Sequence, residues 1–573
     1  MASCSVSATT VGMAAERSNA VLPEAERLSV PLRPPTPLCS APPLPDGPCP
    51  VCPRLAVEFE PWRQAGYWKA LHQRALQREA ALRQEIEQLR AQLRLREQQL
   101  FGRKTETTAA TAPTPMSATP DAPPRRPRGQ QPGQPGPKRR DHSHLPAVVE
   151  EHEIPGADCH CDRCGRPFAP VSGTEDSTIL EVEVKAYRRV IRRRRYRPTC
   201  NCGVHPGIVS APPASRVLPK SHLGVSLWVT LLLDKYLFYR PTYRLLADLR
   251  THGLDLSLGT LTDGLQRLLP LFEPVYEALA AHSRQQPLWH ADETRWQVFA
   301  TVEGKVGFRW YLWAFHAEEV IVFVLAQGRA HDVPEQYLGP DASGIMVVDR
   351  YKAYQVIDQV KQGLIILAFC WAHVRRDFLS VARTWPDQES WALAWVERIG
   401  TLYRLNAARL AVQEEPASFA AADASLRAAV TAMEKQGESE LAEPSLHPAR
   451  QKVLESLGNH WTGLTVFVEH PEVPLDNNTA ERTVRGPVVG RKNYYGSGAV
   501  WAGQLAAILF SLLQTLCLWG LNPRSWLTAY LTACAESGAE APADVQGFLP
   551  WNLNDQQRRS WSLEDEDGRT DTS

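Results

Sequence analysis

The chain has 573 residues, which at about 100–200 residues per domain predicts roughly three to five domains, and 43% of its residues are hydrophobic. Its 63 Lys and Arg residues balance 63 Asp and Glu residues, so the overall charge gives no sign of a nucleic-acid partner. The first ten residues lack the basic start and apolar run of a signal peptide, and the apolar stretch 227–233 is too short to cross a membrane. These features predict a cytoplasmic protein without a membrane partner, in which clustered cysteines favour metal binding over disulfides.

The N-terminal segment, residues 1–60, is rich in Pro, Ala and Ser, and 22 of the 46 prolines lie in the first 150 residues. This composition predicts a disordered segment. Residues 61–104 differ because apolar residues recur there at the 4-3-4-7 spacing of a coiled-coil seam: Leu82, Ile86, Leu89, Leu93 and Leu100. A self-associating coil and a single amphipathic helix docked on the protein both fit this pattern, and Gly102 suits the helix end.

Residues 105–145 form a predicted flexible linker whose end is basic, which suits either contact with phosphate or a solvated tether. The next segment, 146–215, holds a cysteine cluster. Its two close pairs are separated by 35 residues and suit a tetrahedral structural zinc site: Cys161, Cys164, Cys200 and Cys202. Inert thiols in a small β unit are the alternative.

Between these cysteine pairs lie two β-like runs, 178–184 and 187–196. The second is rich in arginine, including Arg192 and Arg194, and is predicted to bind phosphate unless it is only a solvated basic face. Residues 216–284 are predicted to be a helical, helix-turn-helix-like DNA-binding region, with 257–268 as the recognition helix.

From residue 285 the pattern becomes α/β. Five strands are predicted from aromatic and β-branched runs: 287–300, 308–316, 320–326, 344–348 and 364–369. Their order predicts an α/β RNase H-like core in two parts, 285–373 and 471–536. A long helical insertion, 374–470, interrupts this core, and a C-terminal segment with an acidic tail follows at 537–573.

Three acids stand out by their context. Asp292 lies within the first predicted strand, Asp349 ends the apolar run 344–348, and Glu481 lies at the start of a predicted helix for which Asp476 is the candidate N-cap. A carboxylate at the end of a buried strand is costly unless a cation or hydrogen bonds compensate it. Hard divalent cations prefer such oxygen ligands, and two ions together can promote an in-line displacement at phosphorus. Each acid taken alone also fits a structural role.

The chain resembles the transposases of the insertion sequence 66 family. The matching segments are FGRK at 101–104, HADET at 290–294, VDRYKAY at 348–354, CWAHVRRDF at 370–378, PLDNNTAER at 474–482, VGRKN at 489–493 and LPWNL at 549–553. Their order and spacing extend the resemblance over most of the chain.

This resemblance implies a DDE-type catalytic core that uses magnesium or manganese, with Asp292, Asp349 and Glu481 as the metal-binding triad. Because 132 positions separate Asp349 from Glu481, the helical block between them is expected to be an insertion. The family also carries a small zinc module, usually with two Cys-x-x-Cys pairs. The second pair here is Cys-x-Cys, so Cys159 and His205 are candidate replacement ligands.

Basic residues beside these acids are the predicted DNA contacts. His373, Arg375 and Arg376 follow the fifth strand and are expected to face the scissile phosphate or nearby backbone, with a core role as the alternative for His373. Four more lie on or just after the helix of Glu481, where a solvated face is the alternative: Arg482, Arg485, Arg491 and Lys492. Glu293 is expected to point to the opposite face of its strand from Asp292.

The predicted function is transposition of a bacterial insertion sequence, with metal-dependent cleavage at the element ends and strand transfer into target DNA. The expected partners are DNA, a second copy of the chain in a dimer or higher oligomer, and small accessory proteins of the element. Two alternatives remain open. One is a catalytically silent, domesticated DNA-binding protein, and the other is an RNase H-like nuclease that cuts without joining.

Overall fold

A computed structural model gives the structure of residues 51–101, 208–304 and 306–562, and of short pieces between them: 149, 163, 164, 166, 180, 184–197 and 199. Within 51–101, side chains are described for 65–91, 93 and 94. The chain divides into two compact units, residues 1–93 and 94–573.

One long helix, α1 (Val51–Phe101), covers residues 61–101 of the predicted coil segment, whose last three residues lie outside the described part of the chain. It begins ten residues before the predicted start, so the prediction of disorder up to residue 60 was wrong for 51–60. The proline at position 53 lies in the first turn, where a missing N–H costs nothing. Four seam residues expose 47–60% of their surface: Leu82, Ile86, Leu89 and Leu93. Self-association through this seam stays a prediction.

The arginine-rich run forms less sheet than predicted. Only its last two residues are a strand, β1 (Arg195–Tyr196), which pairs antiparallel with β2 (Val209–Ser210). The prediction was too long because a period-2 pattern does not supply a partner strand, and residues 187–194 are exposed. Cys164 is exposed and free, whereas the other predicted and candidate zinc ligands lie outside the described residues: Cys159, Cys161, Cys200, Cys202 and His205.

Three helices precede the sheet: α2 (Val225–Tyr236), α3 (Thr242–Thr251) and α4 (Leu258–Arg284). Ser257 caps α4, since its hydroxyl accepts a hydrogen bond from the Thr260 N–H at 3.1 Å. Helix α4 continues 16 residues beyond the predicted recognition helix, which ended at Leu268, and it packs against α15 (Val500–Leu518). The DNA-recognition role of its first turns stays a prediction.

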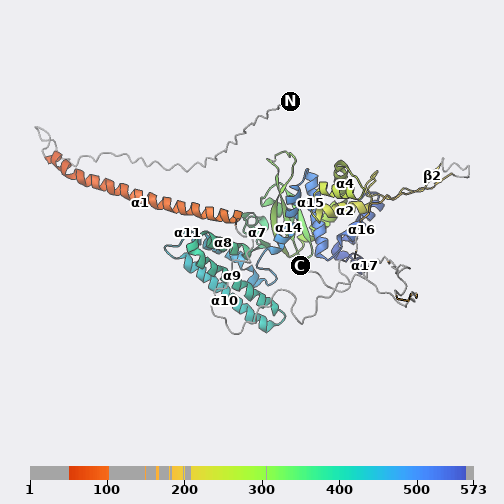
Figure 1. The fold of residues 1–573 in the computed structure, drawn as a ribbon. Helices are drawn as coiled ribbons and strands as arrows, with labels where there is room; N and C mark the ends of the chain where they lie inside the picture. The colour runs from red at the N-terminus through yellow and green to blue at the C-terminus, as the bar shows by residue number, and fades with distance from the viewer. Residues whose placement is uncertain are drawn as a thin grey trace, which may run out of the picture. The chain divides into compact units, whose positions relative to one another are not determined.

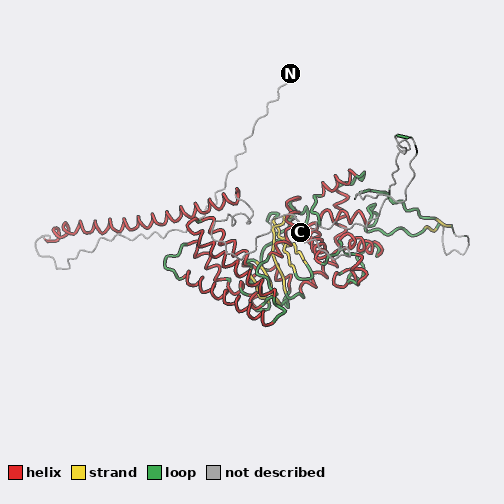
Figure 2. Tube along the Cα trace, turned by 60° about the horizontal axis from the view of Figure 1, so that its bottom comes forward, coloured by secondary structure: helices red, strands yellow, loops and turns green. Residues whose placement is uncertain are grey.

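The centre of the larger unit is a five-stranded mixed sheet with the order β5-β4-β3-β6-β7. Its strands are β3 (Leu288–Gln297), β4 (Arg309–His316), β5 (Ile321–Ala326), β6 (Gly344–Val348) and β7 (Ile365–Phe369). The pairs β3–β4 and β4–β5 are antiparallel, whereas β3–β6 and β6–β7 are parallel. Figure 2 shows these strands flanked by helices. Each strand falls within its predicted range, and the sheet is compatible with the core of a DDE transposase.

Helix α15 closes one edge of this sheet. Its Ser511 hydroxyl accepts a hydrogen bond from the Phe323 N–H at 2.7 Å, and its Thr515 hydroxyl accepts one from the Ile321 N–H at 3.0 Å. The outward N–H groups of Ile321 and Phe323 on β5 are thereby satisfied without another strand. Among the described residues α15 is the one helix apolar and long enough to cross a membrane, but 67% of that window is buried inside the protein, as expected for a core helix.

After β7 the chain forms a helical block (Figure 1). Its elements are α8 (Trp371–Thr384), η2 (Pro386–Gln388), α9 (Glu389–Ala411), α10 (Pro416–Leu441), α11 (Pro448–Asn459), α12 (Trp461–Leu464) and α13 (Val466–Glu469). Phe378 stacks on Trp395 with ring centroids 5.2 Å apart. The fully buried Arg409 donates hydrogen bonds to Asp423, Asn406 and two carbonyls, so its charge is compensated.

The remaining helices frame the sheet. Between the strands lie α5 (Asp332–Leu338), α6 (Lys352–Gln355) and α7 (Asp358–Lys361). After the helical block come α14 (Asn478–Tyr494), which packs on β3 and β4, and α16 (Pro523–Glu536), which packs on α2. The chain then forms η3 (Gln546–Phe548), η4 (Pro550–Asn552) and α17 (Asp555–Ser560).

The start of β6 depends on a glycine. Gly344 has φ +148°, and a Cβ there would lie 2.2 Å from the carbonyl oxygen of Pro287. That carbonyl accepts a hydrogen bond from the Ile345 N–H at 2.8 Å, so this close approach sets β6 beside β3.

We predict that Gly344→Ala lowers the free energy of unfolding by roughly 2–4 kcal/mol, because the new Cβ would combine backbone strain with a clash. Urea unfolding measures the change. Gly458→Ala in α11 is the control, since a Cβ there meets nothing within 4 Å, and its effect should be about 1 kcal/mol or less in either direction. Equal stability of Gly344→Ala and wild type would contradict this interpretation.

Candidate active site

Strand register places Asp292 and Asp349 side by side. In the parallel pair β3–β6, His290 is opposite Val347. Asp292 lies two residues after His290, within β3. Asp349 lies two residues after Val347 and is the first residue after β6. Because adjacent parallel strands lie about 4.8 Å apart, the two acids are neighbours at the level where β6 ends and β3 continues toward Gln297.

The pKa of Asp292 is affected by the charges of the other two acids. Burial, followed by the charge of Glu293, raises the pKa of Asp292 to about 7, and the charges of Asp349 and Glu481 contribute in the same direction. A hydrogen bond of 2.9 Å from the Glu293 N–H opposes the shift. Asp349 accepts a similar bond from the Tyr351 N–H at 2.9 Å. The three predicted acids therefore lie close enough for their charges to interact.

Glu481 lies on the first turn of α14, the helix that packs on β3 and β4. The N-cap of α14 is Asn477 and not the predicted Asp476, whose carboxylate instead accepts a hydrogen bond from the Asn478 N–H at 3.1 Å. Polar contacts fix the helix on the sheet: Asn477 bonds His290 and the Ala291 carbonyl, and Thr483 bonds His316.

The carboxylate of Glu481 is engaged by two groups from the first turns of α8. Its Oε1 lies 2.6 Å from Arg376 Nη2 and 3.7 Å from His373 Nε2. Among the described residues, no three His, Cys, Asp or Glu side chains lie close enough together to hold a metal ion as they stand. The fold brings the acids together, whereas the side chain of Glu481 is turned toward Arg376.

Comparison with known proteins identifies the family to which the chain belongs. Residues 220–505 match the model of the IS66 transposase family, and this range contains all three acids. The chain belongs to the IS66 transposase family. It is 27% identical to the uncharacterized protein y4jD of Sinorhizobium fredii over 71% of this chain and 80% of that protein. It is also 25% identical to the uncharacterized protein y4hP of the same organism, over 71% and 76% of the two chains.

Glu293, the neighbour of Asp292 in this IS66-family chain, is buried and bonded to other side chains. Its side chain is only 1% exposed, forms an ion pair with Arg329, and accepts a hydrogen bond of 2.6 Å from the Tyr354 hydroxyl. The Arg329 guanidinium also lies 3.8 Å from the centroid of the Tyr351 ring. Sequence reasoning missed Arg329 and Tyr354, although Tyr351 and Tyr354 both lie in the family segment VDRYKAY. The buried Glu293 carboxylate, paired with a partly exposed Arg329, therefore supports the strand that carries Asp292.

The predicted phosphate contacts on α8 fall into different environments. Arg376 is exposed but paired with Glu481. Burial, with help from Arg376, lowers the pKa of His373, whose Nδ1 is buried without a hydrogen-bond partner among the described residues. Arg375 is half-buried on α8, close enough to Tyr403 of α9 for its charge to act on that tyrosine.

On α14 the predicted DNA contacts separate onto two faces. Three are exposed at helical spacing, Arg482, Arg485 and Lys492. Arg491 instead donates a hydrogen bond of 3.0 Å to the Thr294 hydroxyl and another to the Arg295 carbonyl, so it ties the helix to β3. In the short basic segment near β1, Arg192 and Arg194 are exposed.

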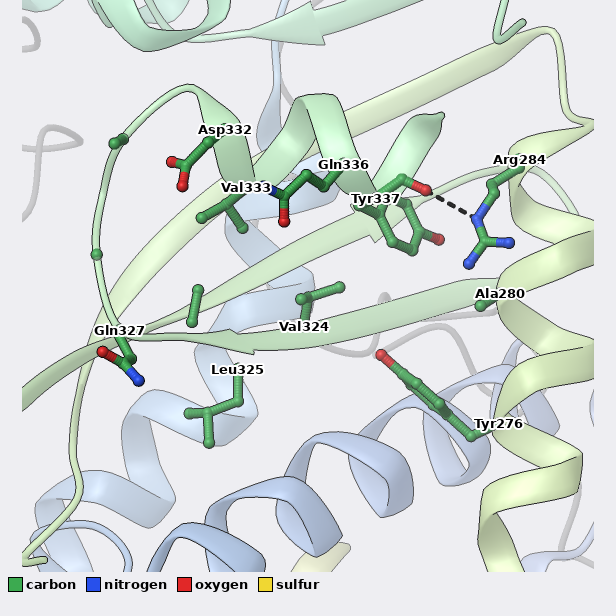
Figure 3. A pocket seen from close by; sticks show the side chains of 13 residues that line it. Tyr276, Ala280, Arg284, Val324, Leu325, Gln327, Asp332, Val333, Gln336 and Tyr337 are labelled. Atoms are coloured by element: carbon green, nitrogen blue, oxygen red, sulfur yellow. Dashed lines mark hydrogen bonds between the residues drawn. The ribbon is translucent and has the colours of Figure 1, made fainter. Parts of the chain in front are cut away.

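A cavity of about 500 Å³ lies elsewhere, between α4, the end of β5 and α5 (Figure 3). Tyr276, Arg284 and Tyr337 line it, and Arg284 donates a hydrogen bond of 2.8 Å to the Tyr337 carbonyl. None of the three acids contributes to its walls. The candidate active site is therefore the surface where β3, β6 and α14 meet.

The contact between α14 and β4 predicts a pH dependence of stability. Burial, with the charges of His290 and Arg482, lowers the pKa of His316 to about 4. Because the folded pKa lies below the unfolded value of about 6.5, this contribution is complete above pH 6.5 and is lost as the pH falls toward 4.

We predict that wild type loses about 2 kcal/mol more unfolding free energy than His316→Gln between pH 7.5 and pH 4.5. Glutamine can still bond Thr483 but does not titrate. Urea unfolding at both pH values measures the difference. If the two proteins lose equal stability, His316 does not enter the folded state in its neutral form.

Proposed function

We propose that this protein is a DDE-type transposase of a bacterial insertion sequence, which cuts DNA at the element ends and joins those ends to target DNA. The observation that carries the proposal is the register of β3 and β6. It places Asp292 and Asp349 at the same level, with the helix of Glu481 docked on β3. The order of three antiparallel and two parallel strands supports an RNase H-like core.

Asp292, Asp349 and Glu481 would hold divalent magnesium or manganese. Their chemistry fits such an ion because all three offer hard carboxylate oxygens, and because the charges of Asp349 and Glu481 act on a partly buried Asp292. When bound, the metal would lower the pKa of the attacking hydroxyl and stabilise the departing oxygen. Glu481 would exchange its ion pair with Arg376 for this role.

The proposed reaction has two steps, and residues of the chain would position the DNA for both. In the first step a water oxygen bonds to phosphorus and the P–O3′ bond breaks, which leaves a 5′-phosphate and a free 3′-hydroxyl. In the second step this hydroxyl bonds to a target phosphorus and releases a target 3′-hydroxyl. Arg376, once released from Glu481, would bind a phosphate oxygen beside the reacting phosphorus.

We predict that Asp292→Asn, Asp349→Asn and Glu481→Gln each reduce end cleavage and strand transfer at least about 100-fold, while binding to element ends persists. Labelled element ends and a target plasmid measure cleavage, joining and binding together. Glu472→Gln is the matched control, because Glu472 is exposed and pairs with His470 near α14.

The same assay separates the alternatives. Cleavage without joined product would identify a nuclease, and binding without cleavage in wild type would identify a silent DNA-binding protein. Either result would overturn the proposed function. Retained cleavage in all three variants would remove the acids from the mechanism.

DNA would lie along the exposed face of α14. Arg482, Arg485 and Lys492 lie within eleven residues, or about 15 Å of helix, and start beside Glu481. Exposed cations in a row neutralise phosphates without reading sequence. Arg491 is proposed to hold the helix and not to contact DNA.

We predict that Arg485→Ala and Lys492→Ala each weaken binding about equally for all DNA sequences and lower the slope of log K against log salt by about 1. Fluorescence anisotropy at several salt concentrations measures both quantities. Arg404→Ala is the control, since Arg404 is exposed on α9 and pairs with Glu397. An unchanged slope for both α14 variants would place DNA on another surface.

Other parts of the proposal complete the assembly. The exposed seam of α1 would pair two copies and so bring two element ends together. Structural zinc would be bound by the cysteine module at 146–215, whose Arg192 and Arg194 would contact phosphate. The enzyme would act on DNA in the cytoplasm, with small accessory proteins of the element as further partners.

A further inference from the structure

Asn477 occupies a position between the three acids that the catalytic proposal leaves unused. It is only 2% exposed, and it stands at the N-cap position of the helix that carries Glu481, although its side chain does not bond the helix. A buried amide must satisfy its donors and its acceptor inside the protein, so its bonds show what it holds together.

The side chain of Asn477 joins α14 to β3. Its Nδ2 donates a hydrogen bond of 2.7 Å to the Ala291 carbonyl, one residue before Asp292. Its Oδ1 lies 3.1 Å from Nδ1 of His290, which is itself buried. Both ends of the amide are therefore engaged by the strand of Asp292.

The backbone of Asn477 is hydrogen-bonded to Glu481 and is linked through Cys370 to the residue before Asp349. Its carbonyl accepts a hydrogen bond of 3.1 Å from the N–H of Glu481 itself. Its own N–H donates to the sulfur of the buried Cys370 at 3.2 Å. The Cys370 N–H in turn bonds the carbonyl of Val348 at 3.1 Å, one residue before Asp349.

We propose that Asn477 is a positioning residue that sets Glu481 against Asp292 and Asp349 and so fixes the geometry of the divalent-cation site. One residue is thus linked by short paths to β3, to the end of β6 and to the first turn of α14. Without the Nδ2 bond to Ala291, the first turn of α14 would lose its direct tie to the strand of Asp292. Metal affinity would then fall because the three carboxylates would no longer be held in register.

This inference rests on the proposed function, and its test reads metal binding directly. Mn²⁺ binding to the full-length chain, with its cysteine module saturated with Zn²⁺, is measured from the electron paramagnetic resonance signal of free Mn²⁺. For Asn477→Ala we expect the Mn²⁺ half-saturation concentration to rise about 10- to 100-fold. The near-isosteric Asn477→Leu should behave in the same way, because the hydrogen bonds and not the volume are lost.

Asn406→Ala is the matched control. Asn406 is another buried asparagine, 5% exposed, but it bonds Arg409 in the helical block. This variant should lose thermal stability and keep the wild-type Mn²⁺ affinity, while element-end binding stays unchanged in all three variants. If the Asn477 variants do not fold, Cys370→Ala carries the test, since it removes the acceptor of the Asn477 N–H and should weaken Mn²⁺ binding in the same direction.

The outcomes separate the two proposals. If Asp292→Asn leaves Mn²⁺ binding unchanged, the proposed metal site itself fails. If Asp292→Asn abolishes binding but Asn477→Ala and Asn477→Leu bind as wild type does, the positioning role of Asn477 is wrong. Rescue by Asn477→Leu alone, or an equal loss in Asn406→Ala, would show a general packing effect and would also overturn the inference.

Discussion

The parallel pairing of β3 with β6 is the constraint on which the candidate site depends. It sets two aspartates beside each other, one within β3 and one directly after β6, and like charges on neighbouring strands repel. The pKa of Asp292 is raised first by burial and then by the charge of Glu293, and the charges of Asp349 and Glu481 add smaller contributions in the same direction. A fold that maintains such an arrangement must stabilise it elsewhere, and a divalent cation is the ligand that would relieve the repulsion.

The stabilising contacts lie around the acids and not at them. Behind β3, Glu293 is buried against Arg329 and Tyr354. Above the sheet, α14 is fixed by polar groups, among them Thr483, which bonds His316. At the far edge, hydroxyls of α15 satisfy the backbone of β5. The strands that carry the acids are therefore held by contacts on several sides, while the exposed ion pair between Arg376 and Glu481 is a contact that can be exchanged at little cost.

Local sequence patterns predicted the sheet well because they depend on short-range chemistry. Aromatic and β-branched runs located all five strands, and the position of Asp349 directly after a buried strand marked it as unusual. Glu481 could not be placed by pattern alone, since 132 positions separate it from Asp349, and its identification depended on the family resemblance. The roles of all three acids remain proposals.

What the sequence did not predict are contacts between distant segments. Nothing local indicates that Arg491 turns to Thr294 whereas Arg485 stays exposed, or that Arg376 pairs with Glu481. The N-cap position of α14 is Asn477 and not Asp476, and the side chain of Asn477 finds its partners on β3, which lies nearly 190 residues away in the chain. The start of α1 at Val51 was missed for a different reason. The proline-rich composition of the N-terminal segment predicted disorder, although residues 51–60 are helical.

The central claim is that Asp292, Asp349 and Glu481 together bind divalent cations. A crystal of the full-length chain soaked in Mn²⁺ tests it most directly, by anomalous scattering at the manganese edge. The account predicts a peak within about 2–2.5 Å of oxygens from Asp292 and Asp349, with Glu481 turned away from Arg376 toward the ion. A fully occupied Mn²⁺ elsewhere and no peak between these acids would contradict it.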